Sequence, residues 1–399
     1  MKEIINIEWL YGSMESLNER PLIPFADEVI EELDALSKAL MRDLQSRLYS
    51  DVVTFAFFCR RGNLMKLKEK HSQLSTFNSQ LRLGRGIIFH IAPSNVPVNF
   101  AYSFVAGLLA GNTNVVRVSQ KQFPQVDIIV KHMCETGMHR VAVVRYPHES
   151  NANEIFSQLC DVRVIWGGDA TIANIRQNPL KPRAFDICFA DRYSIAAINS
   201  DKITSEYLTL NSENLKTLAE HFYNDTYLFD QNACSAPHLI LWVGKKENIS
   251  QAQNLFWQAV YEVVKQKYQF QEKMAVDKLT ALYKQAVAMS IKEAPTQDNL
   301  LKRVALSSLP QDIDEFRCAC GYFSEYKATS LDELASIITD KYQTLAYYGF
   351  EPQELADFVL RNRLSGIDRI VPIGKTTDFS LTWDGMNLIE RMSRIVDII

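Results

Sequence analysis

The fold is decided by the stretch Gly84–Gln120, GRGIIFHIAPSNVPVNFAYSFVAGLLAGNTNVVRVSQ. Its first apolar run, Ile87–Ile91, is short and rich in strand-forming residues, which predicts a buried β-strand. Small and apolar residues then fill Val98–Ala110 over the length of a helix, which a Gly-Asn pair ends. Val115–Val118 predicts a second buried strand. A strand, a helix and a strand of this combined length form the crossover unit that connects two parallel strands.

The same alternation continues along the chain as far as residue 199. Further strands are predicted at Arg140–Tyr146, Val162–Trp166, 185–190 and 194–199, and helices at Gln125–Met138 and Glu154–Cys160. The predicted strands are continuously apolar, which is typical of strands covered by helices on both faces. The fold class is therefore predicted to be α/β, with a doubly wound parallel sheet.

A second set of elements begins near Ser205. It comprises a long helix, an apolar strand at His238–Gly244, and two long polar helices between residues 250 and 294. We therefore expect two doubly wound domains, residues 1–204 with the N-terminal helices and residues 205–365. Residues 366–399 contain short runs separated by glycine and proline, and we expect them to pack back on the domains or to form an oligomer interface.

Composition excludes several classes of function. The net charge of −4 gives no indication of a nucleic-acid-binding protein. No apolar run is long enough to cross a bilayer, and the N-terminus lacks the pattern of a signal peptide. The seven cysteines are scattered, which is typical of a reducing cytoplasm and not of a disulfide framework. Cys318 and Cys320 form the one close pair in the sequence, and without a second pair at zinc-site spacing we expect no metal.

Two polar turns follow predicted strands, where open α/β sheets place their ligands. In the first, APSNVPVNF, the neutral amide of Asn95 can donate to a developing oxyanion, or it can simply hold the turn together. In the second, WGGDATI, Gly167 and Gly168 precede a helix whose N-terminus would favour a phosphate. The alternative for Asp169 is an ordinary helix N-cap.

The end of the strand at 115–118 bears on cofactor choice. A carboxylate at this place usually binds an adenosine ribose, whereas positive charge accommodates a 2′-phosphate. Here Gln120 is neutral and Ser119 lies between Arg117 and Lys121, which favours NADPH over NADH if a dinucleotide binds. The alternative is a solvated strand end.

Cys234, in FDQNACSAPHLILWVG (229–244), is either a nucleophile or a small buried hydrophobe. His238 follows four residues later. If both lie in one strand, they share a face but are separated by ~13 Å, so a direct Cys–His dyad is not expected.

Taken together, these motifs resemble the aldehyde dehydrogenase superfamily. The resemblance rests on PSNVP at 93–97, AGNT at 110–113, RVSQ at 117–120 and QNACSA at 231–236, which follow the order and separation of the superfamily motifs. It implies an aldehyde-dehydrogenase-like fold, with one cofactor-binding and one catalytic domain.

The sequence is more closely similar to the LuxC-type fatty acyl-CoA reductases, the NADPH-dependent branch. The similar segments span nearly the whole chain: RPLIPFADEVIEELDALSKAL (20–40), VIWGGDATI (164–172), DQNACSAPHLILWVG (230–244) and GIDRIVPIGKTTDFSLTWDGMNLIERMSRIV (366–396). The resemblance implies that Cys234 is the nucleophile and Asn95 the oxyanion donor. The residues it assigns to the cofactor are Ser94, Arg117, Ser119, Gly167, Gly168, Asp169 and Thr171.

One departure bears on the reaction. Hydrolytic aldehyde dehydrogenases carry a water-activating Glu in a segment that falls here at Cys188-Phe189-Ala190-Asp191-Arg192, with no carboxylate at the Glu position and Asp191 nearby. Loss of that base would protect an acyl-enzyme from water. A second departure is the segment EFRCACGYFSEY, in which the superfamily motif that steadies the nicotinamide ribose has no clear counterpart.

The resemblance therefore implies NADPH-dependent reduction of an acyl thioester to an aldehyde through an S-acyl-cysteine. The expected substrate is acyl-CoA or an acyl-carrier, with an acyl-protein synthetase as a further partner and a cytoplasmic homo-oligomer as the form of the enzyme. The alternatives are an NAD(P)-dependent aldehyde dehydrogenase that produces free acid, and an inactive scaffold relative.

Overall fold

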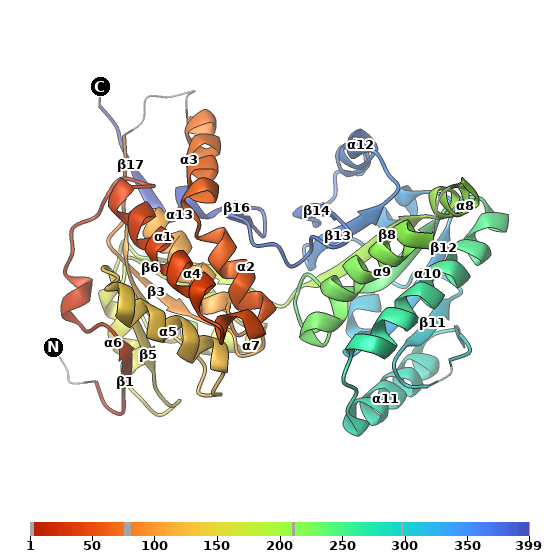
Figure 1. Cartoon of the computed structure of the whole chain (residues 1–399), viewed down its shortest axis with the longest axis horizontal. Helices are drawn as coiled ribbons and strands as arrows, with labels where there is room; N and C mark the ends of the chain where they lie inside the picture. The colour runs from red at the N-terminus through yellow and green to blue at the C-terminus, as the bar shows by residue number, and fades with distance from the viewer. Residues whose placement is uncertain (1–3, 76–80, 210–211, 297, 399) are drawn as a thin grey trace. The chain divides into compact units, whose positions relative to one another are not determined.

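The computed structural model describes residues 4–75, 81–209, 212–296 and 298–398 (Figure 1). The chain divides into two compact units, the first made of Met1–Ala190 and Phe379–Ile399 and the second of Asp191–Asp378. The domain edges expected after residues 204 and 365 both fall inside the second unit. The strand expected at 194–199 accordingly belongs to the second sheet, and residues 366–378 also lie in the second unit.

The first unit contains a six-stranded sheet in the order β1-β5-β4-β3-β6-β7. The strands are β1 Glu8–Tyr11, β3 Ile87–Ile91, β4 Thr113–Arg117, β5 Val141–Arg145, β6 Val162–Trp166 and β7 Phe185–Phe189. Five strands are parallel, and β1 pairs antiparallel with β5 at one edge. The antiparallel edge strand was not expected from the sequence.

Helices cover both faces of this sheet, as the continuous apolar strands predict. The helices are α1 Asp27–Arg42, α2 Ser50–Phe58, α3 Arg61–Ser75, α4 Asn99–Leu109, α5 Pro124–Thr136, α6 Ala152–Leu159, α7 Asp169–Arg176 and α13 Leu388–Met392, with 3₁₀ turns at Glu15–Leu17 and Ser46–Leu48. One apolar core lies between the sheet and α1, α2, α4 and α5, and the other lies against α6 and α7. Successive strand residues alternate between them, with Ile88, Val116, Val143 and Val164 in the first core and Phe89, Val115, Ala142 and Ile165 in the second.

The C-terminal segment completes the first unit. Strand β17 (Ser393–Val396) pairs antiparallel with β2 (Leu81–Gly84), and β15 (Thr382–Trp383) pairs with β16 (Met386–Asn387). The Asn112 side chain, just after α4, donates to the carbonyl of Met392 at 2.9 Å. These contacts join the two sequence segments of the unit.

The second unit contains a seven-stranded sheet in the order β10-β11-β12-β9-β8-β13-β14. The strands are β8 Tyr193–Asn199, β9 Pro237–Val243, β10 Ile291–Glu293, β11 Lys302–Leu306, β12 Tyr322–Ala328, β13 Tyr342–Tyr348 and β14 Arg369–Pro372. All neighbours are parallel except the edge strand β10, which is antiparallel to β11.

Helices also flank the second sheet on both faces. They are α8 Ser200–Thr209, α9 Ser212–Thr226, α10 Lys246–Lys267, α11 Glu272–Ala288 and α12 Pro352–Asn362, with 3₁₀ turns at Tyr227–Phe229, Ile313–Phe316 and Leu331–Ser336. α8, α9 and α10 share one core with the sheet, and α12 packs in a core on the other face. In Figure 1, α9 and α10 run side by side across the sheet. The expected α/β architecture with two doubly wound, mainly parallel sheets is confirmed.

Candidate active site

The residues assigned to the cofactor gather at one edge of the first sheet. Strands β4, β3 and β6 are adjacent and parallel, so their carboxyl ends lie together. Ser94 and Asn95 follow β3, Arg117 ends β4, and Gly167 follows β6. The chain runs from β3 outward to β5 and then crosses to β6, so this edge includes the switch point at which such sheets bind ligands.

The N-terminus of α7 is open at this edge. Gly168 is the N-cap and Asp169 the first helical residue, with no side-chain cap, so the alternative of Asp169 as N-cap is wrong. A Cβ at Gly168 would meet nothing within 4 Å, and Gly168, Asp169 and Thr171 are all exposed. At Gly167, by contrast, a Cβ would lie 3.1 Å from the Thr171 methyl. The open helix terminus can therefore accept an anionic group.

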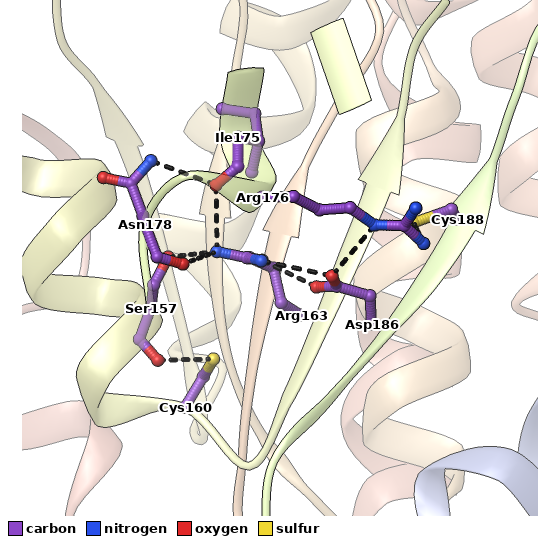
Figure 2. A network of polar contacts seen from close by, with 8 residues as sticks. All are labelled: Ser157, Cys160, Arg163, Ile175, Arg176, Asn178, Asp186 and Cys188. Carbon is purple, nitrogen blue, oxygen red and sulfur yellow. Dashed lines mark hydrogen bonds and ion pairs between the residues drawn. The ribbon is translucent and has the colours of Figure 1, made fainter. Parts of the chain in front are cut away.

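A buried arginine anchors the other end of α7, and the sequence did not reveal it (Figure 2). Arg163 of β6 is 1% exposed and pairs with Asp186 of β7, with 2.7 Å from Nε to Oδ1. Its Nη1 donates to the carbonyls of Ile175 and Asn178 at the C-terminal end of α7, at 3.2 and 2.9 Å. Each of its three nitrogens donates at least one hydrogen bond, with Nη2 bonded to Asp186 Oδ2 at 3.2 Å, and such pairing is the condition for burying a guanidinium. Arg163 thus joins the C-terminal end of α7 to strands β6 and β7.

The end of β4 presents the cationic side chain of Arg117. The Arg117 guanidinium carbon lies 4.9 Å from the Tyr146 ring centroid, and its Nε is buried without a hydrogen-bond partner. Ser119 accepts from the backbone N–H of Lys121 at 3.1 Å. An unpaired buried guanidinium N–H is costly and is satisfied by an incoming acceptor. This orphan donor and the open α7 terminus fit the adenosine and pyrophosphate of a dinucleotide.

The turn that carries Asn95 connects β3 to α4, and a buried polar cluster joins the same two elements. Asn95 itself is exposed. In the cluster, His90 of β3 contacts Ser103 at 2.7 Å and Asn114 at 2.9 Å, and burial lowers the pKa of His90 to about 4. A neutral His90 therefore joins β3 to α4 and β4 and supports the turn.

In the second unit, Cys234 lies in a sharp turn between η3 (Tyr227–Phe229) and β9. Asp230 and Gln231 both adopt left-handed backbone conformations, with φ of 52° and 60°. The buried Gln231 side chain accepts from the N–H groups of Gly321 and Tyr322 at 2.9 and 3.2 Å. It also donates to the carbonyls of Pro237 and Tyr322 at 2.9 and 3.1 Å. These four bonds offset the cost of the strained turn and fix its path.

Two neighbouring strands hold Cys234 itself. The Ser194 hydroxyl of β8 donates to the Cys234 carbonyl at 2.6 Å and accepts from the Thr344 N–H at 3.2 Å. The side-chain amide of Gln343, on β13, donates to the Cys234 sulfur at 3.3 Å. Cys234 is half-buried, so its thiol keeps access to solvent while its backbone and sulfur are both positioned.

A cation acts on the same thiol. Burial lowers the pKa of Arg369, while the charges of Asp378, Asp225 and Cys234 raise it in part. The guanidinium of Arg369 donates to the carbonyls of Thr376 and Lys375 at 2.6 and 2.9 Å. Asp225 of α9 in turn accepts from the backbone N–H groups of Gly374 and Thr376. A connected set of polar groups therefore runs from Asp225 of α9 through the loop after β14 to Arg369, whose charge interacts with Cys234.

Asp191 and His238, the two candidate bases that the sequence analysis considered, are not free to assist Cys234. Asp191 is ion-paired with Arg317, which also donates to the Arg192 carbonyl at 2.8 Å. His238 is buried in β9 and stacks on Tyr193 with 5.7 Å between ring centroids. Burial lowers the pKa of His238 to about 3, so the ring is neutral. Its contacts identify it as a core residue.

Cys318 and Cys320 are half-buried, and burial raises the pKa of both thiols. The backbone N–H of Cys320 donates to the Asp230 carbonyl at 3.0 Å, which links this segment to the turn before Cys234. Across the described ranges, no group of three His, Cys, Asp or Glu side chains is placed to hold a metal ion.

The structure thus gathers the candidates in two sets, each within one unit. Asn95 belongs to the first unit, with the residues that the resemblance assigns to the cofactor, and Cys234 belongs to the second. Sequence reasoning missed Ser194, Gln343 and Arg369. They are far from Cys234 in sequence and belong to no recognisable motif, so only the parallel pairing of β8, β13 and β14 brings them to it.

Comparisons with known proteins identify the family and the fold. Residues 26–395 match the family described as acyl-CoA reductase (LuxC). A Vibrio harveyi long-chain acyl-protein thioester reductase is 23% identical over 331 residues, covering 78% of this chain and 64% of that protein. The chain therefore spans less than two thirds of the length of this curated relative.

Solved structures show the same fold at low identity. Lactaldehyde dehydrogenase from Escherichia coli matches with a TM-score of 0.62 and 11% identity, over 92% of this chain and 85% of that one. A Thermus 1-pyrroline-5-carboxylate dehydrogenase with bound NAD gives a TM-score of 0.62 and 11% identity, over 93% and 81%. Among the helices of the described ranges, none has the length and apolarity needed to span a membrane.

Proposed function

Because the chain belongs to the LuxC family of acyl-CoA reductases, we propose that it reduces an acyl thioester to an aldehyde with NADPH, through an S-acyl intermediate on Cys234. The observation that carries the proposal is the held but accessible thiol, whose sulfur accepts a hydrogen bond from Gln343 at 3.3 Å. A cysteine that only fills space in the core would not need this combination of solvent access, a fixed turn and a donor at its sulfur.

In the proposed reaction, the Cys234 thiolate attacks the carbonyl carbon of the thioester. The bond from that carbon to the donor sulfur breaks, and the donor leaves as a thiol after taking a proton. NADPH, when bound, supplies the hydride that reduces the acyl group. The amide of Asn95 and the backbone N–H of Cys234 are proposed to hold the oxygen as it becomes negative. Breaking the Cys234 sulfur–carbon bond then releases the aldehyde and restores the thiol.

The cofactor residues are proposed by the same reasoning. Ser94, Arg117 and Ser119 would contact the adenosine side, and Gly167, Gly168, Asp169 and Thr171 the pyrophosphate. The orphan Nε of Arg117 supports a preference for the 2′-phosphate of NADPH. We further propose that the catalytic domain is the part of the chain around Cys234, expected at residues 205–365. The proposed acyl donor is acyl-CoA or an acyl-carrier, and the proposed form of the enzyme is a cytoplasmic homo-oligomer with an acyl-protein synthetase partner.

Engagement of Asp191 by Arg317 supports acyl transfer between thiols over hydrolysis. A free-acid-producing aldehyde dehydrogenase needs a base that activates water next to the acyl-enzyme. Assays of aldehyde oxidation with and without coenzyme A separate the two activities. Formation of free acid at the same rate without coenzyme A would contradict the reductase proposal.

Covalent labelling tests the nucleophile directly. Radiolabelled acyl-CoA is expected to label the wild-type protein and the control Cys134→Ala, which alters an exposed cysteine, but not Cys234→Ala. Asn95→Ala is expected to slow NADPH oxidation by ~10²–10³-fold without loss of labelling. Labelling of Cys234→Ala at the wild-type level would refute the assignment. A chain that never consumes NADPH with any acyl thioester would instead be a scaffold.

A further inference from the structure

The side-chain amide of Gln343 donates a hydrogen bond to the Cys234 sulfur at 3.3 Å, and the orientation of this amide is set by its surroundings. Gln343 is 1% exposed, so its amide cannot turn to water. The Thr344 hydroxyl donates to Gln343 Oε1 at 3.3 Å, which leaves Nε2 directed to the sulfur. An amide N–H bonded to sulfur stabilises the thiolate more than the thiol, because the donor interacts more strongly with a charged acceptor.

The backbone of the nucleophile is held from the same side. Ser194 bonds the Cys234 carbonyl and the Thr344 N–H, so β8 and β13 fix the distance between Cys234 and Gln343. Gln231 fixes the preceding turn by four hydrogen bonds. The amide therefore meets a sulfur that has little freedom to move away.

The charged groups around the Cys234 thiol also favour its thiolate form. Arg369 of β14 acts electrostatically on Cys234, and Asp225 of α9 and Asp378 face Arg369. Register places Arg369 opposite Thr344, next to Gln343 along β13. His238 of β9 is neutral, because burial lowers its pKa to about 3, and adds no charge.

We infer that Gln343 is a positioning residue that orients the Cys234 sulfur and favours its thiolate through the N–H that it donates. The inference rests on the proposed function only in taking Cys234 as the nucleophile. It assigns to β13 a role in activating the thiol, with the positive charge of Arg369 as a second contribution.

Alkylation of Cys234 by iodoacetamide tests the inference without substrate or cofactor. The thiolate attacks the methylene carbon, a sulfur–carbon bond forms, and iodide leaves. The rate is measured against pH by mass spectrometry of the peptide that contains Cys234, which separates it from the other cysteines. The midpoint of this profile reports the pKa of the Cys234 thiol.

Gln343→Leu removes the donor, and Gln343→Glu keeps the shape but replaces the donor with an acceptor. A hydrogen bond to a charged group corresponds to about one to two pKa units, so Gln343→Leu is expected to raise the midpoint by that amount. Gln343→Glu is expected to raise it further. Thr344→Val, which frees the amide to turn, is expected to raise it less.

The matched control is Gln353→Leu on α12, where the amide bonds to exposed Asp357 at 2.8 Å. It is expected to leave the midpoint unchanged. At high pH, where the thiol is ionised in every variant, the alkylation rates should converge. A merely structural role would lower the rate at all pH values and leave the midpoint in place.

Unchanged midpoints in Gln343→Leu and Gln343→Glu, with the wild-type circular dichroism spectrum, would overturn the inference. If either Gln343→Leu or Gln343→Glu does not fold, the wild type is compared with Thr344→Val and with the Gln343 variant that does fold. Failure of the proposed function has a different signature, since a chain without reductase activity would still show the alkylation shift.

Discussion

Asp225 offers a stability test whose size follows from the structure. The carboxylate is 1% exposed and accepts from the Gly374 and Thr376 N–H groups at 2.6 and 3.0 Å. Burial outweighs these bonds and raises the pKa of Asp225 from 3.8 to about 6. A shift of about two units corresponds to about 3 kcal/mol in the free energy of unfolding.

The sign follows from which state binds the proton more tightly. The folded pKa is raised, so the contribution of Asp225 to stability is fully present below about pH 4. It is lost as the pH rises through about 6, because the unfolded chain ionises this carboxyl without the cost of burial. Asp225→Asn removes the titration while keeping the shape and one of the two acceptors.

The assay is urea unfolding of wild-type and Asp225→Asn protein from about pH 4 to about pH 8, followed by circular dichroism and tryptophan fluorescence. The free-energy difference between the two proteins is expected to move by about 3 kcal/mol in favour of the variant as the pH rises. Both proteins contain the other carboxylates, so the contributions of those groups to the free energy of unfolding cancel in the difference. A difference that stays constant across this range, or that favours the wild type at the higher pH, would refute the reasoning.

Three further predictions concern other parts of the chain. Arg163→Met leaves Asp186 without its buried partner and should cost about 3–5 kcal/mol in urea unfolding, of which the double variant with Asp186→Leu should recover most. Arg117→Ala should raise KM for NADPH about tenfold or more and leave KM for NADH unchanged in steady-state assays, since it removes a charge-assisted bond to the 2′-phosphate. His238→Phe should leave the pH profile of Cys234 alkylation unchanged, because the ring is already neutral and stacked on Tyr193. A shifted midpoint in the alkylation profile of His238→Phe would mean that His238 assists the Cys234 thiol.

The first sheet was largely predictable from local pattern. Ile87–Ile91 and Val162–Trp166 are strands with the expected bounds, because short apolar runs between glycines and polar turns have few other buried solutions. The segments after residue 294 were harder to predict from the sequence. Strands β11 and β12 have half-buried positions and charged residues such as Arg303 and Glu325, which pair with each other at 3.0 Å only once the strands are adjacent.

The candidate site was likewise predictable only in part. Motif positions such as Cys234 and Gly168 could be proposed from sequence, because a turn at a strand end has a recognisable composition. The residues that position these motif residues could not be proposed from sequence. Ser194, Gln343 and Arg163 have no local signature, since a buried polar side chain is explained only by partners that the fold brings from distant segments.

The division of the chain has a consequence for how it folds. The first unit needs residues 379–399, whose strand β17 pairs with β2 more than three hundred positions earlier. The second unit is continuous in sequence, so during synthesis it can complete its sheet while the first still lacks its final strand and helix. Closing so long a loop is entropically slow. The turn that carries Cys234 is therefore expected to form before the Asn112–Met392 contact, and residues 379–398 complete the first unit only after the second unit has been synthesised.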